Sequence, residues 1–269
     1  MSSEIQTITN IAHRAGSILL KYYGGELDVQ YKMDKFDPVT RADTEADTYL
    51  RQAISNAFPV DEILSEEHKP QPNSYAGRVW MVDPLDGTKD FVGGRESFSI
   101  IIGLYQNNQP ELGVVYAPVS GDILYAQRDK GAYRVRDGSR VRLRVGSNTD
   151  LRQAKLVTRN HVSGDVRPLD QQVDNLPVSD RVPEGSIGLK IGRIADGSAD
   201  VFVHTNLKAC KWDTLGSEII LTEAGGVITD LEGTPLDYSK PTVDWDKYFI
   251  AANNSDMIQQ VLQLIKLPA

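Results

Sequence analysis

The sequence predicts a mixed α/β protein built from two lobes. Apolar residues recur at helical spacing in two N-terminal segments, 5–23 and 40–58, which is the pattern of helices with one buried face. Short apolar runs rich in β-forming residues, separated by turn signals, then fill 98–145. Helical and extended patterns alternate in the remainder of the chain. This change of character predicts lobes at 1–150 and 151–269, packed as one unit because no Pro-rich or Gly-rich linker separates them.

The two N-terminal helices have recognisable ends. In Ile5–Tyr23 the apolar residues fall on one helix face, and Gly24-Gly25 supplies a stop signal. Thr40 and Asp43 have the spacing of a capping box at the start of the second helix, which continues to Phe58. We therefore expect two helices before the first long strand.

The rest of the first lobe has the pattern of an antiparallel sheet. Turn signals such as Asn107-Asn108 and Gly121-Asp122 separate its apolar runs. Arginines alternate with apolar residues in the last run, as at an exposed sheet edge. The expected strands are Val79–Val82, Phe98–Leu104, Leu112–Tyr116, Ile123–Ala126 and the edge Ala132–Val145.

Helices and strands alternate in the second lobe. Its central helix is closed by Gly225-Gly226, a common helix C-terminal signal. The expected helices are Ile187–Ala195, Thr214–Ala224 and Met257–Ile265, and the expected strands are Val201–Val203 and Tyr248–Ala252.

The composition is that of a soluble globular protein, with 40% hydrophobic and 25% charged residues. A net charge of −8 argues against a nucleic-acid polymer or an anionic membrane as partner, although it leaves room for a small anion. No apolar run approaches the roughly 20 residues of a membrane span, and the first residues lack the pattern of a signal peptide. The single cysteine, Cys210, suits a reducing compartment. We therefore expect a cytoplasmic protein.

The most informative motif is Asp83-Pro84-Leu85-Asp86-Gly87-Thr88, directly after the apolar run Val79–Val82. Pro84 fixes one backbone φ angle, and Gly87 permits a backbone conformation that is closed to other residues, so both suit a tight turn. Such a turn can direct two carboxylates and a carbonyl oxygen to one point, and hard divalent cations prefer oxygen ligands. The same residues are common in acidic surface turns. From the residues alone, a metal site and a surface turn both remain open.

Three other acidic positions lie at strand ends or helix starts, where the sites of α/β folds gather. Glu66-Glu67 follows a short apolar run, Asp213 precedes the helix Thr214–Ala224, and Asp43 lies in a first helical turn. Each also has an ordinary structural interpretation. The two glutamates could lie on a solvated face. Asp213 could be a helix N-cap, and Asp43 could compensate the helix dipole.

Taken in order, these motifs resemble a known family. The chain contains a Glu-Glu pair, an Asp-Pro-Leu-Asp-Gly-Thr turn, a distant Trp-Asp and a helix that ends in Glu-Ala-Gly-Gly. They are Glu66-Glu67, Asp83–Thr88, Trp212-Asp213 and Glu223–Gly226. This order is similar to that of the magnesium-dependent, lithium-sensitive phosphatases that include inositol monophosphatases and 3'(2'),5'-bisphosphate nucleotidases. The resemblance covers about residues 10–255 and implies an alternating α-β-α-β-α sandwich.

The resemblance implies a catalytic site with two or three Mg²⁺ ions, and inhibition by Li⁺ and Ca²⁺. One ion is expected on Glu66, Asp83 and the carbonyl of Leu85. A second is expected on Asp83, Asp86 and Asp213, and a third on Glu66 and water. Paired metals suit phosphoryl transfer, which requires charge neutralisation and an in-line nucleophile.

The resemblance also assigns roles in catalysis. Asp43, Glu66 and Thr88 are the expected catalytic residues, with Thr88 and Asp43 orienting a water molecule and taking its proton. The backbone N–H groups of Gly87 and Thr88 are expected to hold phosphate oxygens. The sequence shows no zinc-protease pattern, no P-loop and no Gly-x-Ser-x-Gly elbow that would indicate a competing chemistry.

The second lobe is expected to select the phosphate ester. Leu156–His161 and Cys210–Thr214 resemble the bisphosphate nucleotidases, in which a lysine and a nearby serine hold the second phosphate. Lys190 and Ser186 are the matching residues, although the serine lies four residues before the lysine instead of three. His204 stands where many nucleotidases have an arginine and inositol monophosphatases a glutamate. It is a further candidate for substrate binding.

We therefore expect a Mg²⁺-dependent phosphomonoesterase that converts 3'-phosphoadenosine 5'-phosphate to AMP and phosphate. An inositol-1-monophosphatase or a sugar-phosphate phosphatase is the alternative within the family. An alternative of another class is a regulatory protein that binds phosphate or metal without turnover. The complete set of predicted catalytic residues favours an enzyme, and the resemblance allows a monomer or a homodimer.

Overall fold

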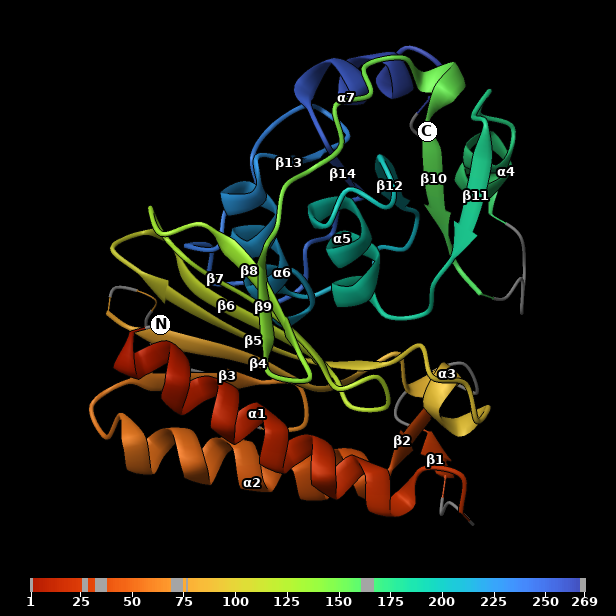
Figure 1. The fold of residues 1–269 in the computed structure, drawn as a ribbon. Coiled ribbons are helices and arrows are strands. Elements are labelled where there is room, and N and C mark those ends of the chain that lie inside the picture. The colour runs from red at the N-terminus through yellow and green to blue at the C-terminus, as the bar shows by residue number, and fades with distance from the viewer. Residues whose placement is uncertain are drawn as a thin grey trace.

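The computed structural model of the chain is a layered sandwich of helices and sheets (Figure 1). It describes residues 2–25, 29–31, 38–68, 75, 77–160 and 167–266. Helices α1 and α2 form the first layer, a seven-stranded sheet the second, α5 and α6 the third, a five-stranded sheet the fourth, and α4 and α7 the last. This order confirms the predicted α/β class and the α-β-α-β-α sandwich.

The seven-stranded sheet belongs to the first half of the chain. Its strands follow one another in sequence order, and all neighbours are antiparallel except the first pair, which is parallel. The strands are β3 (Glu62–Ser65), β4 (Val79–Asp86), β5 (Ser99–Gln106), β6 (Gln109–Ala117), β7 (Asp122–Gln127), β8 (Ala132–Arg136) and β9 (Ser139–Arg142). The predicted antiparallel region is therefore confirmed, and β9 is the exposed edge.

Two amphipathic helices, α1 (Ser3–Tyr22) and α2 (Arg41–Ala57), pack on one face of this sheet. Their buried apolar residues form one core cluster with residues of β4, β5 and β6. The predicted capping box is present, because the Thr40 hydroxyl accepts from the N–H of Ala42 and the Asp43 carboxylate accepts from the N–H of Thr40. A two-stranded pair, β1 (Val29–Tyr31) and β2 (Pro38–Thr40), precedes α2.

The five-stranded sheet lies in the second half, in the order β11-β10-β12-β14-β13. β10 pairs in parallel with β11 and β12, whereas β14 is antiparallel to both of its neighbours. The strands are β10 (Lys155–Thr158), β11 (Asp180–Pro183), β12 (Val201–His204), β13 (Val227–Asp230) and β14 (Phe249–Ala252). The helices are α4 (Pro168–Asp174), α5 (Ile187–Ala195), α6 (Lys211–Ala224) and α7 (Ser255–Leu262), and a 3-10 turn covers Leu151–Gln153.

The helix boundaries differ from the sequence expectation by up to three residues, and one of these differences bears on the predicted site. Helix α6 begins at Lys211, three residues before the predicted Thr214. Asp213 therefore lies inside the first turn, where its carboxylate accepts from the N–H of Cys210 at 2.6 Å. The reciprocal bond of a capping box lets the helix start earlier than the apolar pattern indicates.

Glycines let α6 approach the seven-stranded sheet closely. Gly216 lies on the helix, and Gly103 and Gly113 lie on β5 and β6 beneath it. A Cβ atom at Gly113 would lie 2.0 Å from the carbonyl oxygen of Gly216. This contact sets the distance between α6 and the sheet, and therefore the position of Asp213 near the helix start.

We expect Gly113→Ala to destabilise the protein by about 3 kcal/mol or more, because the clash is with backbone and cannot be relieved by a rotamer change. Urea unfolding followed by circular dichroism measures the effect. Gly77→Ala is the matched control, since a Cβ there meets nothing within 4 Å, and a change below about 0.5 kcal/mol is expected. Equal stabilities of the two variants would contradict this account of the α6 contact.

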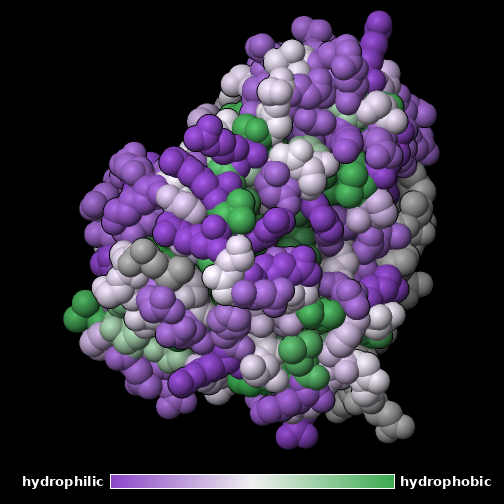
Figure 2. Space-filling model, viewed as in Figure 1, coloured by the Kyte–Doolittle hydropathy of each residue, from purple (hydrophilic) through white to green (hydrophobic). Residues whose placement is uncertain are grey.

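The surface in Figure 2 is mostly hydrophilic, with apolar residues scattered over it. In the described part of the chain, none of the helices combines the length and the apolar character that crossing a bilayer requires.

Candidate active site

A cavity of about 360 Å³ lies where β4, β10 and β12 end and where α5 and α6 begin. It collects residues from both halves of the sequence. One group in its lining consists of the acids Glu66, Asp83, Asp86 and Asp213, which influence one another electrostatically. A second group consists of Arg159, Arg167, Lys190 and His204, with Asp170 among them. Lys89, Asp90 and Asp174 line the cavity as well. Most of the residues singled out from the sequence therefore surround one space.

The Asp83–Thr88 turn has the geometry that its residue types suggest. Strand β4 is buried along its whole length and carries Asp83 and Asp86 at its end. Gly87 has a φ of +93°, in the left-handed region that favours glycine. A Cβ atom there would also lie 2.8 Å from the carbonyl oxygen of Ser97. Thr88 then opens the short helix α3 (Thr88–Val92), so the turn is a buried strand-to-helix junction and not an acidic surface loop.

The carboxylates at this junction influence one another. Burial raises the pKa of Asp83 well above its usual range, and the negative charges of Glu66, Asp86 and Asp213 raise it further. Burial likewise raises the pKa of Asp213 well above normal, with Glu66 and Asp86 adding to the effect. Anionic oxygens gathered in a buried place are unfavourable unless a cation compensates them.

Asp86 is held by the start of α5, about a hundred residues away in sequence. Its carboxylate accepts from the N–H groups of Ile187 at 3.0 Å and Gly188 at 2.8 Å, and from the hydroxyl of Ser186. Burial raises the pKa of Asp86, while these hydrogen bonds and the charge of Lys190 oppose the rise. Ser186 itself is fully buried and caps α5 by accepting from the N–H of Leu189. Its role in substrate binding stays a prediction. In this structure its hydroxyl donates to Asp86 and accepts from the N–H of Leu189.

As they stand, no three His, Cys, Asp or Glu side chains among the described residues are arranged so that they could hold a metal ion. The donor set nevertheless fits one chemically. Glu66, Asp83, Asp86 and Asp213 offer only oxygen, line the same cavity and repel one another. Oxygen-rich anionic surroundings are what Mg²⁺ and Ca²⁺ select.

Asp43 and Thr88 lie beside the carboxylates. The Thr88 hydroxyl is 3.4 Å from Asp43 Oδ1 and donates to the carbonyl oxygen of Leu85 at 3.0 Å. Burial raises the pKa of Asp43 to about 6, although its hydrogen bonds from Thr40 work in the opposite direction. A carboxylate that titrates near neutral pH is suited to accept a proton.

The lining of the cavity also includes a buried cation. Lys190 is only 6% exposed, and its Nζ donates to the carbonyl oxygen of Gly185 at 2.7 Å. The Nζ also lies 5.2 Å from the ring centre of Phe202. Burial lowers the pKa of Lys190, whereas the charges of Asp86 and Glu184 raise it. An anion in the cavity would stabilise the charged form.

His204 is an uncharged group in this cavity. Burial, together with the charges of Lys190 and Arg167, lowers its pKa to about 3. Its ring stacks on Phe249, with 4.6 Å between ring centres. Its Nε2 atom is buried and has no hydrogen-bond partner within the described ranges. At neutral pH His204 therefore cannot replace the positive charge of an arginine.

Two arginines that line the same cavity as Lys190 were not predicted as site residues from the sequence. Arg159 follows β10 and pairs with Asp170 at 2.9 Å, and Arg167 precedes α4 and donates to the carbonyl oxygen of Thr205 at 2.6 Å. Both lie in irregular segments without periodicity, so only the position of Arg159 within the Leu156–His161 motif could have drawn attention to it. His161 of that motif lies outside the described residues.

Comparison with known proteins gives a consistent result. Residues 1–266 match the inositol monophosphatase family. The 3'(2'),5'-bisphosphate nucleotidase CysQ of Aggregatibacter actinomycetemcomitans is 36% identical over 242 residues, covering 88% of this chain and 87% of that protein. CysQ of Escherichia coli K12 is 32% identical over 245 residues, covering 87% and 94%. Human inositol monophosphatase 1 is 28% identical over 266 residues, covering 96% and 92%.

Solved structures agree with these matches. The suhB protein of Bartonella henselae superposes with a TM-score of 0.83 at 27% identity, covering 100% of both chains. The inositol monophosphatase of Thermotoga maritima superposes with a TM-score of 0.83 at 28% identity, covering 98% of this chain and 96% of that one.

Proposed function

Because this chain belongs to the inositol monophosphatase family, we propose that it removes the 3'-phosphate from 3'-phosphoadenosine 5'-phosphate. Its class, a phosphoric monoester hydrolase of a metal-dependent family that acts on small phosphorylated substrates, follows from that membership. The observation that carries the choice of substrate is the charge distribution in the cavity. Glu66, Asp83, Asp86 and Asp213 form one group in its lining, and Lys190, Arg159 and Arg167 form another, in which Asp170 pairs with Arg159.

This distribution suits a substrate with two phosphates. The reacting phosphate lies beside the group of acids, where bound cations compensate them. The second phosphate lies against the group of cations, since charged hydrogen bonds to Lys and Arg are strong partners of phosphate. The relatives named as bisphosphate nucleotidases support the same choice.

Glu66, Asp83, Asp86, Asp213 and the carbonyl of Leu85 would hold two or three Mg²⁺ ions, which would supply charge neutralisation and make water more acidic. Within the protein, Thr88 orients the attacking water through its hydroxyl, which lies between Asp43 and the carbonyl of Leu85. Asp43 takes the proton of that water. The backbone N–H groups of Gly87 and Thr88 hold oxygens of the reacting phosphate.

A second candidate is an inositol-phosphate or sugar-phosphate phosphatase. Human inositol monophosphatase 1 and the structure from Thermotoga maritima favour it. Neutral His204 also favours it, because an uncharged imidazole is a better partner for a hydroxyl than for a phosphate.

A substrate panel with Mg²⁺ separates the two candidates. The panel compares 3'-phosphoadenosine 5'-phosphate, inositol 1-phosphate and fructose 1,6-bisphosphate, each with and without Li⁺ and Ca²⁺. We expect the highest kcat/KM for the adenosine bisphosphate, and inhibition by both added ions. A higher kcat/KM for inositol 1-phosphate would replace the first candidate with the second. Absence of hydrolysis of every ester would instead favour the regulatory, non-catalytic alternative.

Lys190→Met tests the second-phosphate contact. The methionine keeps much of the buried stem but removes one charged hydrogen bond, worth about 1.5–3 kcal/mol. We expect KM for 3'-phosphoadenosine 5'-phosphate to rise roughly 10-fold to 100-fold, with KM for 3'-AMP nearly unchanged. Steady-state kinetics on both substrates gives the comparison, with Lys130→Met, an exposed lysine in the β7–β8 turn, as control. Equal effects on the two substrates would show that Lys190 is structural.

A further inference from the structure

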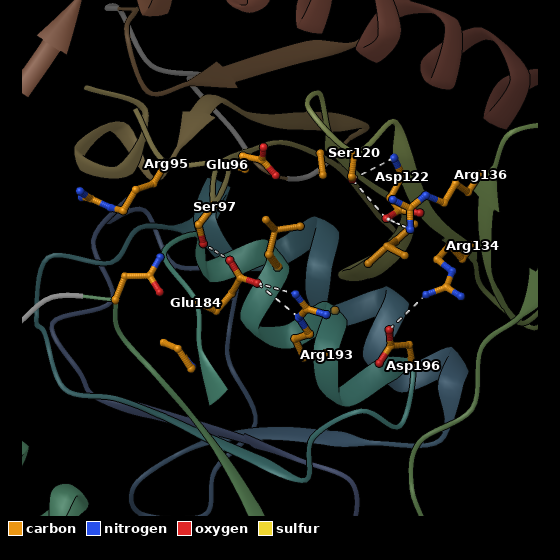
Figure 3. A pocket seen from close by; sticks show the side chains of 16 residues that line it. Arg95, Glu96, Ser97, Ser120, Asp122, Arg134, Arg136, Glu184, Arg193 and Asp196 are labelled. Atoms are coloured by element: carbon orange, nitrogen blue, oxygen red, sulfur yellow. Dashed lines mark hydrogen bonds and ion pairs between the residues drawn. The ribbon is translucent and has the colours of Figure 1, made fainter. Parts of the chain in front are cut away.

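A second cavity, of about 470 Å³, lies between β7, β8 and helix α5, outside the carboxylate site (Figure 3). Four arginines from three separate segments line it. Arg95 follows α3, Arg134 and Arg136 lie on β8, and Arg193 lies on α5. In the view of Figure 3, Arg193 lies between Arg95 on one side and the two β8 arginines on the other. Four acids, Glu96, Asp122, Glu184 and Asp196, line the same cavity, so its formal charge is balanced.

Each of these arginines is paired with a carboxylate, but the arginine is the more exposed partner in every pair. The arginine side chains are between 38% and 52% exposed, whereas the carboxylates are between 6% and 21% exposed. The pairs are Arg95–Asp90, Arg134–Asp196, Arg136–Asp122 and Arg193–Glu184. The paired carboxylates are therefore the more buried partners, and the guanidinium groups form the accessible charged surface together with the exposed Glu96.

Two of the paired carboxylates, Glu184 and Asp196, also accept hydrogen bonds from other groups of the protein, whereas Asp122 Oδ1 is buried without a partner in the described part of the chain. Glu184 accepts from the hydroxyl of Ser97 and from the N–H of Gly185, and Asp196 accepts from the N–H of Ser198 at 2.9 Å. The pairs that involve the β8 arginines are long, 3.4 Å for Arg134 and 3.6 Å for Arg136. A guanidinium has five N–H donors, so these two arginines keep most of their donor capacity for another anion.

We propose that this cavity is a second anion site, which binds a phosphate group as inorganic phosphate or as a phosphate monoester. The planar guanidinium group of an arginine matches the geometry of a phosphate and can bind it with two parallel hydrogen bonds. Arg134 and Arg136 are two residues apart on one strand, so both side chains lie on the same face. Leu124 and Leu189 add apolar surface, and the volume is that of a small-molecule site.

The second cavity adjoins the candidate active site. Asn160 lines both cavities and donates to Asp90 at 2.9 Å. Glu184, which pairs with Arg193, directly precedes Gly185, whose carbonyl oxygen accepts from Lys190. An anion that recruits Arg193 would compete with Glu184 and so act on the segment that holds Lys190.

Titration calorimetry with inorganic phosphate and, separately, with AMP tests the site, each run on the Mg²⁺-loaded protein and on the metal-free protein. We expect two binding events, of which only the active-site event requires Mg²⁺. The double variant Arg134→Gln/Arg136→Gln should weaken the Mg²⁺-independent event at least about tenfold, since two charged partners are lost. Arg140→Gln, an exposed arginine on the neighbouring strand β9 that does not line the cavity, should keep both events. The anion that binds more tightly in the Mg²⁺-independent event identifies the source of the phosphate.

Binding is read independently of hydrolysis, so the outcome does not depend on the identity of the substrate. Unchanged kcat and thermal midpoint in the double variant show that it is folded. A single binding event in the wild type, or two unchanged events in the double variant, would overturn the proposal. A change of molecular mass on gel filtration, caused by the double variant alone, would also overturn it, because the arginines would then lie at a contact between copies.

Discussion

Asp83→Asn is expected to lower kcat for Mg²⁺-dependent hydrolysis by at least about 10³-fold, because metal-assisted charge stabilisation contributes several kcal/mol to phosphoryl transfer. Asp83 is the predicted ligand shared by two ions, and its carboxylate is coupled to three neighbouring acids. The substitution is nearly isosteric. The asparagine oxygen can still accept from the N–H of Leu85, as Asp83 does at 2.9 Å.

The same substitution should raise the stability of the metal-free protein. Burial and the charges of Glu66, Asp86 and Asp213 all disfavour ionised Asp83, so a neutral side chain removes repulsion from the folded state. We expect the thermal midpoint without metal to rise, and the further rise on adding Mg²⁺ to shrink.

Asp137→Asn is the control for both measurements, because Asp137 lies in the exposed β8–β9 turn at a φ of +49° that asparagine tolerates. Wild-type kcat in Asp83→Asn would remove the carboxylate cluster from the mechanism. Lower metal-free stability in the variant would mean that repulsion does not dominate at this position.

The metal and catalytic candidates could be predicted because short local motifs carry them. Asp83 and Asp86 are placed by the buried strand that precedes them and by a glycine that permits the turn. Asp43 and Asp213 are placed by capping boxes, which bring an acidic side chain back to the start of its own helix. Such interactions span a few residues and can be recognised in a sequence.

The missed parts depend on long-range contacts. The contact of the Ser186 hydroxyl with Asp86, a hundred residues away, was not predicted, and the predicted role of Ser186 in substrate binding stays a prediction. Arg159 and Arg167 come together with Lys190 only because β10, α4 and α5 meet at one cavity. The strands β10, β11 and β13 were not predicted, and the edge strand β11 is mostly exposed, so its sequence lacks the apolar run by which β12 and β14 are recognised. Without a contact map, these features have no local signal.

The bond between Asp86 and α5 also bears on the division into lobes. The division at residue 150 stays a prediction, but Asp86, a predicted metal ligand of the first half, is buried against the helix start of the second half. A lobe expressed alone would leave Asp86 without these donors. We therefore propose that the two halves form one folding and catalytic unit.

Asp43→Asn is expected to reduce kcat by about 10²-fold to 10⁴-fold, the range for loss of a general base. The asparagine oxygen can still accept from the N–H of Thr40, so α2 keeps its capping interaction. The pH profile provides a readout that a structural role would not change. Burial raises the pKa of Asp43 to about 6 in the metal-free protein. Because hydrolysis is measured with bound Mg²⁺, wild-type kcat/KM should show an acidic decline that lies below pH 6, and the variant should lack this decline. Asp256→Asn, an acid in the first turn of α7, is the control.

The direction of the pKa shift sets a second test of Asp43. Because its folded pKa lies above the unfolded value, the folded protein holds the proton more tightly between about pH 4 and 6, and stability should decrease as the pH rises through this window. Ionised Asp43 then costs roughly 3 kcal/mol at pH 7, and Asp43→Asn should recover part of it in the metal-free protein. Glu66 contributes to the shift through its negative charge, so bound Mg²⁺ should move the acidic limb of the activity profile to lower pH. A limb that persists in Asp43→Asn would assign the proton transfer to another group.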